Sequence, residues 1–153
     1  MNSVMPAGTY YVGDLCYVMH DAWNECCELF FKDRSDHGCN EGVFQLKDGR
    51  KFANFNTRYG DGGYSSSIDA TFYVDSGSIG CIKLEDIRDE TYSMSKIKDL
   101  GAIVTFEDDF LVSERNGTIS FGGLDIYTGH DPNYQDEEEE EEYYEEYYEN
   151  DDY

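Results

Sequence analysis

Positive charge is scarce in this chain of 153 residues. It contains 11 Lys and Arg against 34 Asp and Glu, so its formal net charge at pH 7 is −23. Proteins that bind nucleic acid or anionic membranes directly use Lys and Arg to displace the counterions of the phosphates. The composition therefore argues against a direct nucleic-acid or membrane ligand, and it makes a basic protein the expected partner.

Long apolar runs are absent as well. Residues 1–11 contain no basic residue and no apolar stretch of signal-peptide length. No later segment approaches the roughly 20 apolar residues that a membrane span requires. We therefore expect a soluble, cytoplasmic chain that is not secreted.

The common signatures of catalysis and cofactor binding are missing. The sequence contains no nucleophile elbow, phosphate loop, dinucleotide fingerprint or EF-hand. Structural zinc sites use C-x-x-C pairs, and the five cysteines form none. We interpret them mainly as buried thiols: Cys16, Cys26, Cys27, Cys39 and Cys81. No cofactor is expected, and a non-enzymatic role is favoured over an enzymatic one.

What is present is the composition of one folded domain. Hydrophobic residues make up 39% of the chain, with 14 Tyr and 9 Phe, which is enough apolar surface for one core. Residues 131–153 contain 13 acidic residues and no Lys or Arg, which leaves 21 acidic and 11 basic residues in 1–130, a net charge of −10. We expect a folded domain in 1–130 and an unstructured acidic tail in 131–153.

The first third of the chain predicts two strands and a helix. Residues 8–14 and 15–19 are β-rich runs separated by a Gly-Asp turn. Asp21 can cap a helix that follows it. One face of that helix is indicated by the i, i+3, i+4 spacing of Trp23, Cys26, Cys27, Phe30 and Phe31. Both cysteines of the pair lie on this apolar face, so core packing accounts for them.

The middle of the chain predicts two strand pairs and a weaker helix. A hairpin is expected over 42–57, with Asp48-Gly49 as its type I′ turn. Strands over 71–75 and 78–83 are expected to pair across Ser76-Gly77. Residues 85–100 are charged and weakly helical in pattern, with Gly101 as the C-terminal stop.

Short strands dominate the last part of the predicted domain. They are expected over 102–106, 110–113 and 118–121, with an edge strand over 124–127, and Arg115-Asn116-Gly117 is a strong hairpin turn. Such frequent turns with one clear helix indicate an α+β fold with a compact, mainly antiparallel β body, either a small barrel or two packed sheets. No internal repeat is evident.

Three strings resemble an uncharacterised β-rich family of large DNA viruses, phages and some bacteria. They are Ala7-Gly-Thr-Tyr-Tyr-Val-Gly-Asp-Leu-Cys-Tyr-Val18, Thr57-Arg-Tyr-Gly-Asp-Gly-Gly-Tyr64 and Val74-Asp-Ser-Gly-Ser-Ile-Gly80. The resemblance spans roughly residues 6–127 and implies a β-rich domain of viral origin, for which a host nucleus is a second expected location. It implies no activity and no ligand residues, and the acidic tail is not part of the family pattern.

Three loops place Asp next to Gly, and they carry the one candidate site within the predicted domain. If the turns converge, Asp14, Asp61 and Asp75, with His20 or His37, could bind a hard metal ion or a ligand, or act in acid–base chemistry. The alternative is structural, because Asp and Gly are the residues that tight turns require. The structural alternative is favoured.

The tail combines a glutamate run with tyrosines. An extended chain advances about 3.3 Å per residue, close to the roughly 3.4 Å between phosphates of one nucleic-acid strand, so the glutamates can imitate phosphates. The tyrosines stand at i, i+4 and could form one aromatic face on a basic partner. The residues expected to bind the partner are Glu137, Glu138, Glu139, Glu140, Glu141, Glu142, Tyr143, Tyr144, Tyr147 and Tyr148. A purely solubilising tail is the alternative.

Taken together, these features favour a non-enzymatic acidic interaction protein. It would bind or mask the basic surface of a nucleic-acid-binding protein, histone or nuclease, as a DNA mimic or a chaperone, and with a viral origin it would inhibit a host factor. A hydrolase or a metal- or ligand-binding domain that uses the Asp-Gly loops is a second hypothesis. A structural component of a virion is a third.

Overall fold

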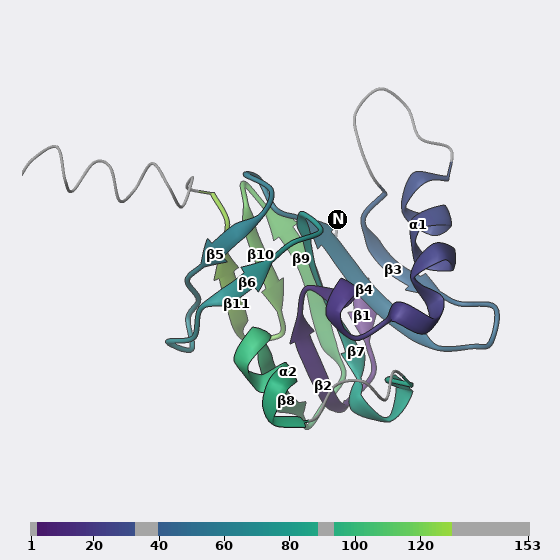
Figure 1. The fold of residues 1–153 in the computed structure, drawn as a ribbon. Coiled ribbons are helices and arrows are strands. Elements are labelled where there is room, and N and C mark those ends of the chain that lie inside the picture. The colour runs from purple at the N-terminus through teal and green to yellow at the C-terminus, as the bar shows by residue number, and fades with distance from the viewer. Residues whose placement is uncertain (1–2, 33–39, 89–93, 130–153) are drawn as a thin grey trace, which may run out of the picture.

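A computed structural model describes residues 3–32, 40–88 and 94–129 of the chain. In these residues the strands form three antiparallel sheets (Figure 1). The central sheet has five strands in the order β3 (Gly42–Gln45), β4 (Lys51–Asn56), β7 (Ser78–Lys83), β2 (Gly8–Gly13) and β8 (Ala102–Phe106). The second has four, in the order β1 (Ser3–Met5), β9 (Phe110–Arg115), β10 (Thr118–Phe121) and β11 (Leu124–Tyr127). A two-stranded ribbon pairs β5 (Gly62–Tyr64) with β6 (Phe72–Val74).

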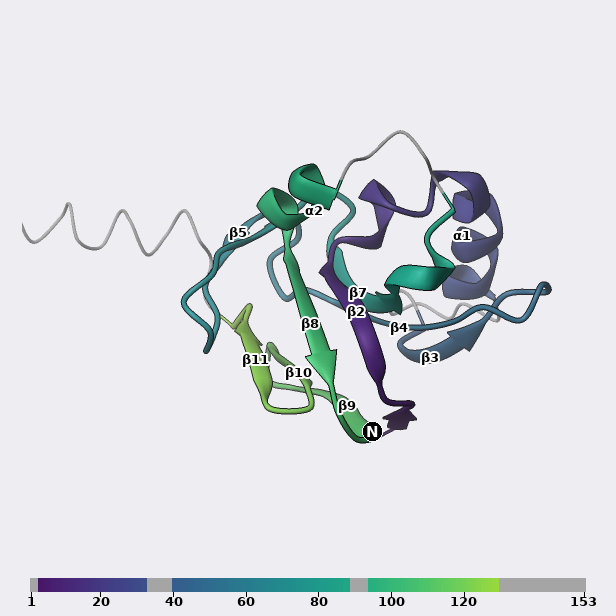
Figure 2. The same ribbon diagram turned by 90° about the horizontal axis from the view of Figure 1, so that it is seen from below.

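Helical segments connect and cover these strands. The 3-10 turns η1 (Leu15–Tyr17) and η2 (His20–Ala22) follow β2, and η2 runs directly into α1 (Trp23–Phe31). A third 3-10 turn, η3 (Leu84–Asp86), follows β7, and α2 (Met94–Leu100) precedes β8. Figure 2 shows α1 on one side of the central sheet and strands β9 to β11 on the other. The described fold therefore has three layers, with the five-stranded sheet in the middle.

The central sheet is buried on both faces, and consecutive residues of β2 show this. Tyr10 and Val12 pack into the core between the two main sheets, whereas Tyr11 packs beneath the helical segments, and all three are fully buried. Because successive side chains of a strand point to opposite faces, a run of buried residues requires cover on both sides. The core between the sheets also contains Phe55, Ile79, Cys81, Val112, Ile119, Phe121 and Ile126. The core beneath the helices contains Leu15, Val18, Met19, Cys26, Phe30, Phe52 and Ile82.

The predicted fold class is confirmed, and of its two forms the structure has the packed sheets. The predicted helix is also found, with Cys26 and Phe30 on its buried face. The hairpin turn at Asn116-Gly117 is confirmed in detail, because Asn116 has φ 54° and Gly117 has φ 90°, the left-handed pair that a type I′ turn requires. It joins β9 to β10 with Arg115 opposite Thr118.

Two predictions near the start of the chain are wrong. Residues 15–19 do not resume a strand, because the Asp14 side chain accepts a hydrogen bond from the backbone N–H of Cys16 at 3.0 Å and turns the chain into η1. Asp21 does not cap α1. The N-cap is Ala22, without a side-chain hydrogen bond, and the Asp21 carboxylate instead accepts a hydrogen bond from Arg50 at 2.9 Å.

Two predictions in the middle of the chain need correction. The hairpin over 42–57 exists, but its turn is not type I′, because of its two residues only Gly49 has a positive φ, 102°. The Gly49 N–H donates to the Leu46 carbonyl at 2.9 Å, which makes a longer loop whose last residue is the left-handed glycine. Strand β6 does not pair with β7. It pairs with β5, and β7 lies between β4 and β2 in the central sheet.

Candidate functional site

The Asp14 carboxylate is the centre of the densest polar cluster around the predicted Asp-Gly loops. It is fully buried at the end of β2. One oxygen accepts the backbone N–H groups of Asp75 at 2.6 Å and Ser76 at 2.7 Å. The other accepts the Ser76 hydroxyl at 2.8 Å, in addition to the N–H of Cys16. A carboxylate that accepts four hydrogen bonds holds the turn between β6 and β7 in place.

The three Asp-Gly loops, whose convergence was the condition for a site, lie close together. Thr57, just after β4, donates its backbone N–H to the Gly77 carbonyl at 2.9 Å and its hydroxyl to the Gly60 carbonyl at 2.7 Å. The turn that Asp14 holds is therefore joined to the loop that contains Asp61. Asp61 itself is exposed, and the Asp75 carboxylate accepts the Tyr17 hydroxyl at 2.8 Å.

This arrangement favours the structural reading of the three aspartates. Among the described residues, no group of three or more His, Cys, Asp or Glu side chains is placed to hold a metal ion. The lone pairs of Asp14 are directed at its own turn, so little coordinating capacity is left for an ion. His20 lies exposed at the start of η2, and His37 lies outside the described residues.

A cavity of about 270 Å³ opens beside this turn, between α1 and the end of the central sheet. It is lined by Trp23, Cys27, Phe30, Phe31, Asn54, Asn56, Ser76 and Ser78. Asn54 is 2% exposed, and its Oδ1 is a buried polar atom with no hydrogen-bond partner. Buried polar atoms are nearly always paired in folded proteins, so this one marks the cavity as unusual.

Sequence reasoning missed this cavity, although part of its signal was present. Phe52, Asn54 and Asn56 alternate along β4, so they share the face that packs beneath the helical segments. On this face of β4, two amides follow a core phenylalanine. They indicate a polar patch where an apolar core is expected. Trp23 was recognised only as a member of the apolar helix face.

Arg50 forms a second polar cluster, which sequence reasoning also missed. Its guanidinium is bonded to Asp48 through Nε at 3.0 Å, to Asp21 through Nη2 at 2.9 Å and to the Asp86 carbonyl at 3.1 Å. Burial alone would lower the pKa of Arg50, but the hydrogen bonds to Asp48 and Asp21 raise it overall. The same hydrogen bonds hold the pKa of the Asp48 carboxyl below its ordinary value. The cluster ties η2, the β3–β4 turn and η3 together.

Three of the described thiols, Cys16, Cys26 and Cys81, have raised pKa values, which disfavours nucleophilic chemistry. Cys26 and Cys81 are buried, and Cys16 and Cys27 are half-buried. Burial, with the neighbouring Cys27 as the next cause, raises the pKa of Cys26 to about 12. Burial and then the Asp14 carboxylate raise the pKa of Cys16 well above its usual range. Because the thiolate is the reactive form, the raised pKa values leave little of it at neutral pH at Cys16 and Cys26.

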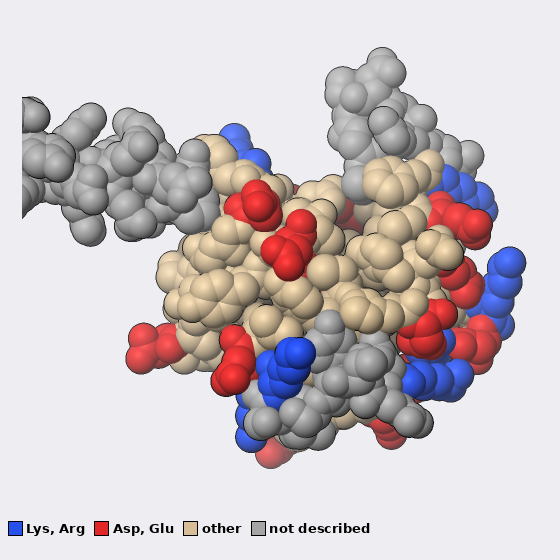
Figure 3. Space-filling model, in the orientation of Figure 1, with Lys and Arg blue, Asp and Glu red and all other residues tan. Residues whose placement is uncertain are grey.

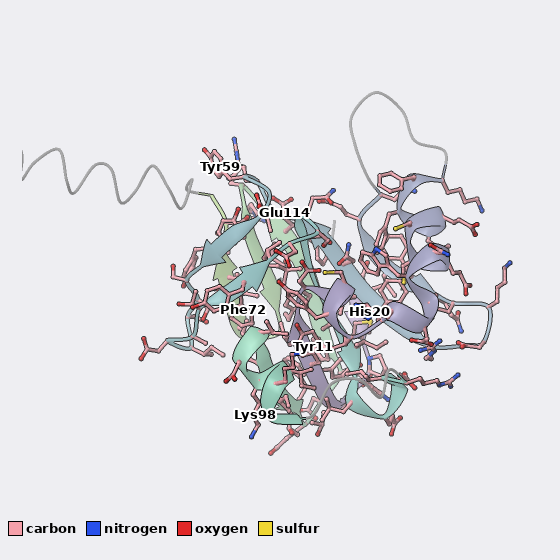
Figure 4. All side chains as sticks on the ribbon, viewed as in Figure 1. Tyr11, His20, Tyr59, Phe72, Lys98 and Glu114 are labelled. Carbon is pink, nitrogen blue, oxygen red and sulfur yellow. The ribbon has the colours of Figure 1, made fainter. Side chains whose placement is uncertain are left out.

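Figure 4 separates the interior from the rim of the body. Tyr11 and Phe72 lie within it, whereas Tyr59 stands at its upper edge and Lys98 at its lower edge. Tyr59 is 46% exposed and follows Arg58 in the loop after β4.

None of the helices in the described ranges is long and apolar enough to cross a membrane. Every tail residue that the sequence marks for partner binding, from Glu137 to Tyr148, lies outside the described residues.

No protein-family model, curated protein or solved structure matches this chain. The resemblance to the viral family therefore rests on its three sequence motifs alone.

Proposed function

We propose that this chain is a non-enzymatic acidic interaction protein that binds the basic surface of a nucleic-acid-binding protein. One observation carries the proposal: residues 131–153 contain 13 acidic residues and no Lys or Arg. A segment without cations of its own cannot neutralise its charge internally, so its most favourable contacts are with cations of another molecule.

The charge of the body supports the same partner. The described residues contain 17 Asp and Glu against 10 Lys and Arg, a balance of −7. Two of those cations, Arg50 and Arg88, form ion pairs with Asp48. In Figure 3 the basic side chains on the visible face are scattered, mostly beside acidic ones, and do not form a basic patch. A phosphate backbone would meet net repulsion on such a body, and a basic protein would meet net attraction.

The mode of binding follows from the spacing of the tail. In an extended chain, carboxylates along Glu137–Glu142 follow one another at about the interval of nucleic-acid phosphates. Arg side chains pair with carboxylates and stack on aromatic rings, so a groove that binds DNA offers partners for the glutamates and for the tyrosines after them. A viral origin, which the sequence motifs imply, would make a host nucleic-acid-binding protein the natural target.

A competition experiment tests the proposal. Labelled duplex DNA is bound to purified core histones or to a purified basic nuclease, and the chain is titrated in while the anisotropy of the label is followed. We expect the full chain to displace the DNA, and a chain ending at residue 130 to need at least about tenfold more protein, because most of the cation-binding charge is gone.

A third version of the chain separates a specific tail from a merely charged one. In it, the residues of 137–148 are reordered so that one Tyr follows every two Glu, with composition and net charge unchanged. The proposal expects weaker competition from the reordered tail than from the natural one. Equal competition by all three chains would remove the tail from the function, and circular dichroism of each chain would verify that the body is folded.

A further inference from the structure

We propose that the cavity between α1 and the end of the central sheet binds a neutral, planar heterocycle with adjacent hydrogen-bond donors and acceptors, the chemistry of a nucleobase or nucleoside. The proposal does not involve residues 131–153 and goes beyond the function proposed above.

The floor of the cavity is polar where the fold calls for an apolar core. On the helix-facing side of β4, Phe52 is fully buried in the core, but Asn54 and Asn56 take the next two positions. Strand β7 contributes Ser78 beside Asn56, and Gly80 beside Asn54. A Cβ at Gly80 would clash first with the Ala53 carbonyl and then with Leu15, and it would also lie 2.9 Å from Asn54 Oδ1. The packing of the sheet therefore requires this glycine, and its small size also leaves room beside the amide.

The amide of Asn54 is not committed to the fold. Its oxygen is buried and has no hydrogen-bond partner, which is costly unless a bound molecule or water supplies one. A half-turn about the last side-chain bond exchanges the oxygen and the nitrogen, so Asn54 can offer either an acceptor or a donor to the cavity. An amide in this role matches the adjacent donor and acceptor on the edge of a base.

The opposite wall is aromatic. Trp23 and Phe30 lie two turns apart on α1, with ring centroids 5.9 Å apart and an interplanar angle of 73°. Phe31 also lines the cavity and is 44% exposed. A flat ring placed between this wall and the polar floor would stack on one side and form hydrogen bonds at its edge. Aromatic stacking with amide contacts is the usual way in which proteins hold a single base.

One edge of the cavity is fixed in advance. The hydroxyl of Ser76 is held by Asp14 at 2.8 Å and lies 3.0 Å from the hydroxyl of Ser78. The buried Asp14 carboxylate thus positions a serine of the cavity as well as its own turn. A ligand would meet this pair of hydroxyls without the cost of ordering them.

Size and charge define the ligand class. The cavity of about 270 Å³ is slightly below the usual range for drug-sized ligands, so it suits a small molecule. The described residues that line it include no Lys, Arg or His, so they offer a phosphate no cationic partner. With the net charge of −23, this favours an uncharged base or nucleoside over a nucleotide or a nucleic acid.

The chain carries its own probe for this site, because Trp23 is the only tryptophan in the sequence. Adenosine, guanosine, cytidine and uridine are titrated separately into the full chain, with tryptophan fluorescence and isothermal calorimetry as readouts. We expect saturable quenching and heat with at least one of the four, and weaker binding of the corresponding 5′-monophosphate. Absence of saturable binding by all four nucleosides would overturn the proposal.

An Asn54→Leu variant tests the amide directly. We expect it to raise the melting temperature of the free protein, because an unpaired buried oxygen is removed, and to weaken nucleoside binding about tenfold or more. Gln45→Leu also replaces an amide by leucine, at an exposed position of neighbouring β3, and should leave binding unchanged. A lower melting temperature for Asn54→Leu with unchanged nucleoside binding would show that the amide only holds structural water, and would overturn the proposal.

The two proposals can be tested independently of each other. Asn54→Leu leaves residues 131–153 intact, so its competition with DNA for a basic protein should equal that of the natural chain.

Discussion

The carboxylates of the body and those of residues 131–153 are the same chemical group in two different situations. At least six carboxylates among the described residues accept backbone N–H groups, and most of these bonds lie at the ends of strands or in turns: Asp14, Glu25, Glu41, Asp48, Asp109 and Glu114. Residues 131–153 contain 13 further carboxylates in a segment without Lys or Arg. The body uses its acids to close its own turns, whereas the sequence of the tail provides none of the cations that would pair with its acids.

This comparison shows that acidity alone does not define a function. A count of charges treats Asp14 and Glu140 as equals, although the first is fully buried beneath its hydrogen bonds. Carboxylates that accept backbone N–H groups contribute to stability, and carboxylates without internal partners are available to another molecule. Substitutions in the body should therefore change stability, and substitutions in the tail should change binding.

The largest effect within the body is expected at Asp14. An Asp14→Ala substitution leaves the N–H groups of Asp75 and Ser76 without an acceptor, so the free energy of unfolding should fall by about 3 kcal/mol. Urea denaturation followed by circular dichroism measures this loss. Asp61→Ala is the matched control, because that aspartate is exposed in the adjoining loop, and it should change stability by less than about 0.5 kcal/mol. Equal losses from both would break the distinction between the two kinds of carboxylate.

The next largest effect is expected at Arg50, a buried cation that pairs with two acids of the body. Its side chain is 5% exposed and bonded to Asp21 and Asp48, so Arg50→Met should cost about 2 kcal/mol of unfolding free energy. The unfolding free energy of Arg50→Lys should lie between that of Arg50→Met and that of the natural chain, because lysine keeps the charge but loses the forked geometry. If lysine restored full stability, charge and not geometry would hold the cluster.

The smallest effect concerns pH. Hydrogen bonds from Arg50 lower the pKa of Asp48 below its ordinary value of 3.8, so the folded protein binds the Asp48 proton more weakly than the unfolded chain does. The stabilisation is therefore fully present above that value and is lost as the pH falls below it. Melting temperatures between about pH 5 and pH 2.5 should fall less steeply for Arg50→Met than for the natural chain. Parallel curves for the two proteins would show that Asp48 does not contribute to the acid sensitivity.

Local turn chemistry accounts for what the sequence predicted well. The Asn116-Gly117 turn and the apolar face of α1 depend on neighbouring residues, and both are found. The errors arise where a distant partner decides. Asp21 was predicted to cap the helix, but its carboxylate accepts a hydrogen bond from Arg50, 29 residues away. Strand β6 was predicted to pair with β7 because the two are adjacent in sequence. In the structure, β4 and β2 pair with the two edges of β7.

The candidate sites divide in the same way. The composition of the Asp-Gly loops marked them as turns, but neither their convergence nor the bond from Asp14 to the Ser76 turn, a contact across 62 residues, could be read from it. The cavity at Asn54 combines residues of α1, β4, β7 and the turn before β7. No local pattern could join these elements, because their proximity follows from the order of strands in the central sheet.

The salt dependence of binding to a basic protein tests the central claim most directly. Affinities of the full chain and of residues 1–130 for purified core histones are measured at two salt concentrations. If the tail supplies the cation-binding charge, the full chain should bind more tightly at low salt and lose affinity more steeply as salt rises, because more ion pairs are screened. Equal affinities and equal salt dependence for the two chains would contradict the account.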